Sequence, residues 1–154
     1  MKQKGFTLVE LVVVIVILGI LAATALPRFI SVATDARIAA LNGMAGAMRS
    51  AVALAQSRYI ATGSTTATTI NMAVGGATQA VVVAAGTGIP AGTTTGIQAA
   101  LQNNADGFTF TCSATTPGSC TVVQASGPTA CLVTYDGTAG TVSTTALTAA
   151  NCGG

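Results

Sequence analysis

The chain has 154 residues, enough for one domain plus a membrane anchor but not for two sizeable domains. Only 6% of the residues are charged, 51% are hydrophobic, and there is no His. Lys2 and Lys4 account for the whole formal net charge of +2, and no Lys or Arg follows Arg58. Because a nucleic-acid interface needs clustered Lys and Arg, no direct nucleic-acid binding is expected of this chain.

An apolar run extends from Phe6 to Leu26 and contains one charged residue, Glu10. A helix over this run would be about 32 Å long at 1.5 Å per residue, which roughly matches the hydrocarbon core of a bilayer. Lys2 and Lys4 precede the run and would hold the N-terminus in the cytoplasm. A carboxylate in such a segment is costly and usually functional, so we expect Glu10 to have a partner.

Two ordinary interpretations of this N-terminus are incomplete. The run is too long for the apolar part of a cleaved signal peptide, and residues 22–26 form a poor cleavage site. A single-span anchor explains the lysines and the length. It leaves Glu10 unexplained, because the sequence shows no internal partner for this carboxylate.

From Arg28 to Tyr59 the pattern becomes amphipathic, which predicts a helix with one buried stripe. The apolar stripe consists of Ile38, Leu41, Ala45, Met48, Val52, Ala55 and Tyr59, and the opposite side carries Asp35, Asn42, Arg49 and Gln56. We expect the stripe to pack on a sheet. Asp35, Arg37 and Arg49 are expected to be solvated or to form weak pairs between copies of the chain.

After the helix, the composition changes to Thr, Ala, Gly and Val, with no charge over residues 61–105. We expect strands over residues 68–74 and 79–85, loops at residues 86–88 and 92, and a short helix over residues 97–102.

Towards the C-terminus, apolar and polar residues alternate more regularly. This alternation predicts strands over residues 108–112, 120–124 and 131–135. Asp106-Gly107 and Asp136-Gly137 read as turns. An antiparallel sheet made from these strands would place Phe108, Phe110 and alternate valines against the amphipathic helix.

Four cysteines lie in the last third, at positions 112, 120, 131 and 152. An even count behind an export-type N-terminus predicts two disulfides in an oxidising compartment. Four cysteines allow three pairings. A zinc site is disfavoured because the chain has neither His nor a C-x2-C spacing.

The chain carries no set of residues for catalysis. A histidine triad, a phosphate-binding loop and a paired carboxylate site are all missing from the sequence, and two C-terminal acids make a calcium site doubtful. We therefore predict that the protein is not an enzyme and has no cofactor and no metal site.

Met1-Lys2-Gln3-Lys4-Gly5 followed by Phe6-Thr7-Leu8-Val9-Glu10 resembles the prepilin signature of type IV pilins and type II secretion pseudopilins. The resemblance implies that a prepilin peptidase cuts between Gly5 and Phe6 and that the new Phe6 amine is N-methylated. It also implies that Glu10 pairs with the Phe6 amine of a neighbouring subunit. We expect Phe6 and Glu10 to lie one turn apart on the same helix face.

The same resemblance implies the α+β pilin fold, a long N-terminal helix packed on an antiparallel sheet. Residues 1–5 would be the leader, 6–27 the membrane anchor and filament core, and 28–154 the globular domain. Within that domain the helix ends at about residue 60, the αβ-loop spans 61–105, and the sheet and D-region span 106–154.

Two positions in the helix, Gly19 and Pro27, match interruptions in the type IV pilin helix. The segment between them would lose helicity in assembled filaments, or Pro27 would simply kink the helix. Residues 26–30 and 35–37 look most like the mannose-sensitive haemagglutinin (MSHA) type of type IV pilin.

The preferred disulfides are Cys112–Cys120 and Cys131–Cys152. The second pair resembles the disulfide that closes the D-region of type IV pilins. The first lies outside that pattern, and its cysteines flank the loop of a predicted hairpin.

By this resemblance the chain is a structural pilus subunit. It would start as a single-pass inner-membrane protein and end in a helical homo-oligomeric surface filament used for adhesion, motility or DNA uptake. Its partners would be the prepilin peptidase, the assembly platform and cytoplasmic ATPases. The alternatives are a secretion-system pseudopilin and a membrane-anchored exported binding module that does not polymerise.

Overall fold

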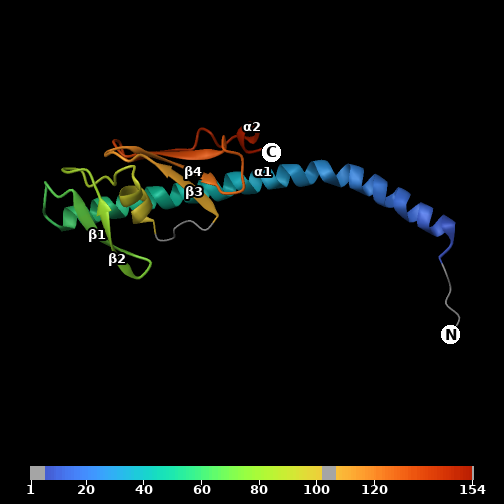
Figure 1. The fold of residues 1–154 in the computed structure, drawn as a ribbon, viewed down its shortest axis with the longest axis horizontal. Coiled ribbons are helices and arrows are strands. Elements are labelled where there is room, and N and C mark those ends of the chain that lie inside the picture. The colour runs from blue at the N-terminus through green and yellow to red at the C-terminus, as the bar shows by residue number, and fades with distance from the viewer. Residues whose placement is uncertain (1–5, 102–106, 154) are drawn as a thin grey trace.

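A single long helix forms the spine of the molecule in the computed structural model, which describes residues 6–101 and 107–153, with only the helical backbone for residues 26–31. Helix α1 (Leu8–Ala61) lies along a folded head with its C-terminal half, while its N-terminal half projects beyond the head and curves gently (Figure 1). The predicted α+β class, with a long N-terminal helix and antiparallel sheets, is confirmed.

The helix is continuous through positions 19 and 27. The interruption predicted between Gly19 and Pro27 concerns assembled filaments, so it stays a prediction. The helix ends at Ala61, and Thr62 is its C-cap, whose N–H donates to the carbonyls of Arg58 and Tyr59. Gly63 follows with a φ of +67°, a left-handed conformation that glycine adopts without strain.

The predicted apolar stripe of α1 forms one side of the core. Leu41, Ala45, Met48 and Ala55 are fully buried, Val52 and Tyr59 are nearly so, and Ile38 packs against them. Asp35, Asn42 and Arg49 are exposed on the other side, as predicted.

Four antiparallel strands form the sheet that covers this stripe: β3 (Phe108–Cys112), β4 (Ser119–Gln124), β5 (Leu132–Asp136) and β6 (Thr141–Ser143), in that order. Phe110 pairs with Val122, which pairs with Val133. This row faces α1, with both valines fully buried. The three predicted strands are confirmed, and β6 was missed because three residues carry too little pattern.

A second, two-stranded sheet consists of β1 (Thr69–Val74) and β2 (Ala77–Val82). Gly75 and Gly76 join them with φ angles of +59° and +83°, the two left-handed residues that a tight hairpin turn requires. The predicted second strand, 79–85, was therefore set too late, because the Gly-Gly turn signal was overlooked.

Two short helices complete the fold. The predicted helix over residues 97–102 lies earlier, as a π-helical turn η1 (Thr94–Gln98). Helix α2 (Ala149–Cys152) was not predicted. It begins at Thr148, whose hydroxyl accepts a hydrogen bond from the Asn151 N–H at 3.2 Å, an ordinary N-cap.

Three arginines of α1 tie the helix to the head through backbone carbonyls. Arg37 donates to the Cys152 carbonyl at 2.9 Å, Arg49 to Val142 at 3.2 Å and Arg58 to Asn71 at 3.1 Å. The expectation that Arg37 and Arg49 are solvated or form weak pairs between copies did not include these bonds, because sequence periodicity does not show which carbonyls come within reach.

Two tyrosines hold the loop after β2. The Tyr59 hydroxyl accepts from the Gly86 N–H at 2.7 Å, and the Tyr135 hydroxyl donates to the Pro90 carbonyl at 2.6 Å. Burial raises the pKa of Tyr135 well above its ordinary value, so this donor keeps its proton at any physiological pH.

Beside this loop three glycines meet with almost no space between their backbones. Gly92 donates to the Pro117 carbonyl at 2.6 Å, and Gly137 donates to the Gly118 carbonyl at 2.9 Å. A Cβ on Gly137 would overlap the Gly92 nitrogen and the Pro117 carbonyl oxygen. Asp136-Gly137, predicted as a turn, is thus also a point of close backbone contact.

We predict that Gly137→Ala destabilises the full chain by about 1–3 kcal/mol, the usual cost of overpacking. Gly43→Ala is the control, because this helical glycine has nothing within 4 Å of an added Cβ and should gain up to about 1 kcal/mol. Denaturant unfolding in detergent measures both. Equal effects of the two substitutions would contradict the close contact at Gly137.

Asp136 makes a pH-dependent contribution to the stability of the fold. The Thr138 N–H donates to its Oδ1 at 2.7 Å, and this bond lowers the pKa of Asp136. A group with a lowered pKa stabilises the fold above its unfolded pKa and loses that effect as pH falls through the folded value. We predict that Asp136→Asn lowers thermal stability at neutral pH and converges with the unaltered chain in acid, so that the acid limb becomes flatter; an unchanged acid limb would refute it.

Candidate assembly site at the start of the long helix

The candidate site begins where α1 starts. Thr7 is the N-cap, with extended backbone angles of φ −79° and ψ 151°, and the helix begins at Leu8. Phe6 therefore lies before the helix, with 89% of its surface exposed. Phe6 and Glu10 therefore do not share one helix face in this structure. The expectation that they do concerns the chain after cleavage between Gly5 and Phe6, so it stays a prediction.

Thr7 and Glu10 form a reciprocal capping box. The Thr7 N–H and hydroxyl donate to Glu10 Oε2 at 2.9 and 2.8 Å, and the Glu10 N–H donates to the Thr7 hydroxyl oxygen at 3.3 Å. The expectation that Glu10 lacks an internal partner is therefore wrong. The signal was present: Thr7-Leu8-Val9-Glu10 is the Thr-x-x-Glu pattern that precedes an apolar run.

The bonds from Thr7 leave part of the Glu10 carboxylate available. Both donors go to Oε2, and among the described residues no hydrogen bond reaches Oε1. The positive end of the helix dipole lies at this terminus and favours a negative charge there. The capping box thus orients the carboxylate at the start of the helix and leaves one oxygen for a further donor.

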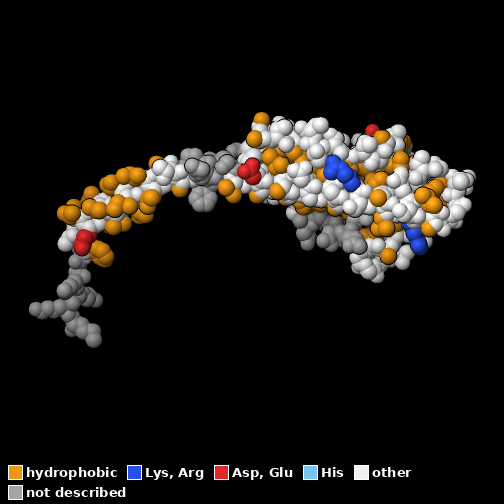
Figure 2. Space-filling model, turned by 180° about the vertical axis from the view of Figure 1, so that it is seen from behind, with side chains coloured by type: hydrophobic (Ala, Val, Ile, Leu, Met, Phe, Trp, Pro, Cys, Tyr) orange, Lys and Arg blue, Asp and Glu red, His pale blue; other side chains and the backbone are white. Residues whose placement is uncertain are grey.

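After the capping box, none of the other described residues covers the first part of the helix. Leu8–Ala25 has a mean hydropathy of 2.8 with none of it buried, and it is long and apolar enough to cross a membrane. Hydrophobic side chains cover this projecting part, with an acidic side chain near its tip (Figure 2). Val32–Ala61 passes the same test but is partly buried, because it supplies the stripe that faces the sheet.

Gly5, the predicted cleavage position, lies outside the described residues, as do Lys2 and Lys4. The described residues hold no group of His, Cys, Asp and Glu that could bind a metal ion.

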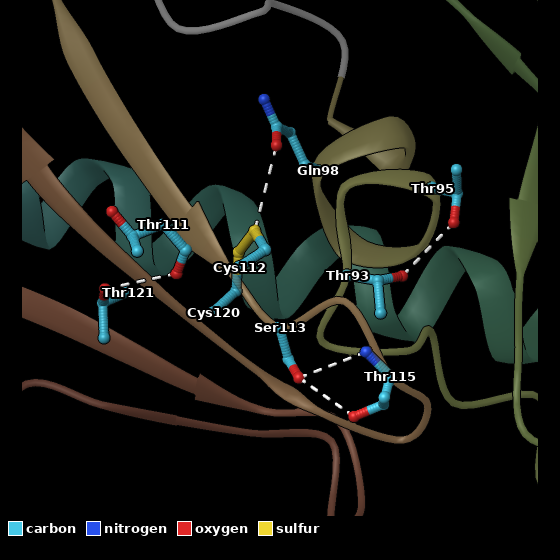
Figure 3. Close-up of a disulfide and its surroundings, with 9 residues drawn as sticks. All are labelled: Thr93, Thr95, Gln98, Thr111, Cys112, Ser113, Thr115, Cys120 and Thr121. Atoms are coloured by element: carbon cyan, nitrogen blue, oxygen red, sulfur yellow. Dashed lines mark hydrogen bonds between the residues drawn. A yellow bond between two sulfur atoms is a disulfide. The ribbon is translucent and has the colours of Figure 1, made fainter.

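Both preferred disulfides are present in the structure, Cys112–Cys120 and Cys131–Cys152. Cys112 and Cys120 are directly opposite each other in β3 and β4, and Figure 3 shows this bridge beside Gln98 of η1. The second bridge fixes the end of α2, where Arg37 also binds the Cys152 carbonyl. The described part of the chain has no free cysteine.

The structure thus combines a helix whose N-terminal part is apolar and long enough to cross a membrane, a carboxylate at the start of that helix, and a disulfide-closed α+β head, which is a pilin-like architecture. The family model of the "Prokaryotic N-terminal methylation motif" matches residues 1–26.

Several type IV pilus proteins match about a third of the chain. The type IV narrow pilus major component PilA5 of Thermus thermophilus is 53% identical over 55 residues, which is 36% of this chain and 47% of the relative. The type IV major fimbrial protein FimA of Dichelobacter nodosus is 42% identical over 50 residues, 32% of each chain. The type IV major pilin protein PilE1 of Neisseria gonorrhoeae is 48% identical over 50 residues, 32% of this chain and 30% of the relative.

The matched part of the chain spans less than half the length of these relatives, and no solved structure matches. Together, the motif and these relatives confirm the predicted resemblance to type IV pilins over the matched part of the chain. The narrower MSHA-type prediction is not confirmed.

We predict that Thr7→Val speeds hydrogen exchange of the Glu10 amide about fivefold, because loss of an N-cap costs about 1 kcal/mol. Thr7→Ser is the matched control and should leave the rate near that of the unaltered chain, since its hydroxyl can donate and accept in the same way. NMR of the full chain in detergent micelles gives both rates. An unchanged rate in Thr7→Val would show that the capping box does not hold the start of α1.

Proposed function

We propose that this chain is the structural subunit of a type IV pilus, and the single observation that carries the proposal is the uncovered apolar half of α1. Large apolar surfaces on a protein are covered by lipid or by another protein. Lipid covers Leu8–Ala25 while the chain is an inner-membrane protein, and the same segments of neighbouring copies cover it in a filament on the cell surface.

Processing supplies the partner that Glu10 needs. Cleavage between Gly5 and Phe6 by a prepilin peptidase creates a cationic amine at Phe6, which is then N-methylated. In an apolar filament core an unpaired carboxylate is strongly unfavourable, and a cation offsets part of that cost. The free Oε1 of Glu10 accepts from the Phe6 amine of a neighbouring copy, while Thr7 holds Oε2.

The proposed organisation follows from these roles. Residues 1–5 are the leader, residues 6–27 serve first as anchor and then as filament core, and residues 28–154 form the head. Gly19 and Pro27 mark the part of the helix that can lose helicity on assembly. The assembly platform and its cytoplasmic ATPases complete the set of partners. The function is polymerisation rather than catalysis, and adhesion, motility or DNA uptake follow from the whole filament.

Two other functions fit less well. A secretion pseudopilin shares the N-terminal motif, but the relatives described above are named as pilus or fimbrial components. A binding module that never polymerises would need neither the capping box nor a carboxylate in its anchor. A sheared surface-fibre preparation that contains this chain separates the pilus subunit from both.

We predict that the mature chain has lost its first five residues, gained one methyl group and lost four hydrogens to its two disulfides. Intact-mass spectrometry of sheared surface filaments measures this directly. An intact Met1 in the filament would overturn the proposed processing.

Glu10→Val should still be processed but should yield no filaments, because the apolar core then lacks its register-setting ion pair. Asp136→Asn, which removes a carboxylate from the head, is the matched control and should assemble normally. Electron microscopy and immunoblots of sheared material score both variants. Normal filaments from Glu10→Val would refute the role of this residue.

A further inference from the structure

The two disulfides of the head differ in how far solvent reaches them. Cys131 and Cys152 are both buried, with 2% and 0% of their surfaces exposed. Cys120 is fully buried as well, whereas Cys112 is half-exposed. Among the residues that the structure describes, Cys112–Cys120 is therefore the one disulfide with a cysteine that a solute can reach.

The place of this bridge in the sheet explains the difference between its two cysteines. Strand β4 lies between β3 and β5, and the register sets Cys120 opposite Cys112 on one side and opposite Tyr135 on the other. Cys112 lies on β3, which is an edge strand. Neighbouring strands thus cover Cys120 from both sides and Cys112 from one side only.

One side chain from outside the sheet reaches Cys112. Gln98 of η1 places its Oε1 at 3.8 Å from the Cys112 Sγ (Figure 3). Because a disulfide sulfur carries no proton, this contact holds the amide only weakly. Gln98 is half-exposed and also lines an open cavity of about 430 Å³ beside the β1–β2 hairpin, so its side chain has room to move off the sulfur.

We propose that Cys112–Cys120 is a redox site that an external dithiol reduces in the folded chain, with the Cys112 Sγ as the sulfur attacked. A thiolate is the nucleophile in thiol–disulfide exchange, and access decides which sulfur it attacks. Attack forms a mixed disulfide at Cys112 and breaks the bond to Cys120, whose Sγ keeps the electron pair and takes up a proton.

The second thiol of the reagent completes the reaction. It attacks the reagent's own sulfur in the mixed disulfide, and Cys112 leaves as a thiol after taking up a proton. The dithiol has then become a disulfide, and two electrons and two protons have moved to the chain.

The fold should survive this reduction, because other contacts hold the same loop. The Ser113 N–H donates to the Ser119 carbonyl at 2.9 Å, directly beside the bridge. Gly92 and Gly137 bind the loop through the carbonyls of residues 117 and 118. The bridge also closes a shorter loop than the second disulfide, with a sequence separation of 8 against 21, so it contributes less stability by the loop-entropy model.

The two bridges then have separate roles. Cys131–Cys152 fixes the end of α2 and stays closed, because neither of its cysteines is open to a thiol. Cys112–Cys120 opens and closes with the thiol content of the surroundings. This property belongs to the head of a single chain, so it does not depend on polymerisation into a filament.

The test treats the full chain in detergent micelles with dithiothreitol, at mildly alkaline pH and without denaturant. Samples are quenched with acid, blocked with N-ethylmaleimide and mapped by peptide mass spectrometry. We expect Cys112 and Cys120 to be labelled at least about tenfold faster than Cys131 and Cys152, because access limits the exchange. In guanidinium, where no cysteine is buried, both pairs should be labelled at similar rates.

Glutathione, a monothiol, identifies the sulfur that is attacked, because it leaves its mixed disulfide in place. The glutathione adduct is expected on Cys112 and the maleimide on Cys120. Hydrogen exchange of the reduced chain should show that the amides of β4 and β5 stay protected.

Gln98→Ala should speed reduction of the Cys112–Cys120 bridge about threefold, because it removes the side chain beside the sulfur and so increases access. Gln79→Ala is the matched control, since Gln79 lines the same cavity, and it should leave the rate unchanged. Equal rates in the two variants would refute the position given to Gln98.

Equal labelling of the two pairs in the folded chain, or a glutathione adduct on Cys120, would overturn the proposed redox site. So would a loss of amide protection throughout β4 and β5 on reduction, and so would a chain that stays fully oxidised until denaturant is added. Each of these results is independent of filament formation, so the redox site and the proposed function fail or stand separately.

Discussion

The rest of the structure depends on one constraint: the two halves of the continuous helix α1 need different surroundings. Over its C-terminal half, α1 needs a partner for one stripe only, and the sheet and the two-stranded hairpin supply it. Over Leu8–Ala25 it is apolar on all sides, and no other part of the chain that the structure describes covers it. Such a helix is stable only among lipids or other helices, so the fold of the single chain already requires a second environment.

The head reaches a defined structure with few charges and a small apolar core. Because it is rich in Thr, Ala and Gly, the head has few large side chains. Hydrogen bonds and close contacts that involve the backbone therefore stabilise much of its structure. Arginines of α1 bind carbonyls, tyrosine hydroxyls hold the loop after β2, and glycines permit close backbone approach. The Cys131–Cys152 bridge, with a sequence separation of 21, adds about 3 kcal/mol by the loop-entropy model.

Strong local patterns made much of this fold predictable. The stripe from Leu41 to Tyr59 and the alternating strands β3, β4 and β5 appear where periodicity placed them. Errors came where the pattern was short or where a turn signal was passed over, as at β6 and at Gly75-Gly76. At the candidate site Glu10 was identified as the unusual residue, but its bond to Thr7 was missed although the Thr-x-x-Glu spacing was there to be seen.

Sequence alone determined the apolar N-terminal run, the carboxylate within it, the processing motif and the face of α1 that is buried, since each depends on neighbours a few residues apart. Only the tertiary structure decided which carbonyls the arginines reach, that Gly92, Gly118 and Gly137 meet, and that Gln98 lies beside Cys112 on an edge strand. Those features depend on the register between strands and on contacts between distant segments. Local periodicity shows which face of a strand is polar, but strand pairing sets which residues stand side by side on that face.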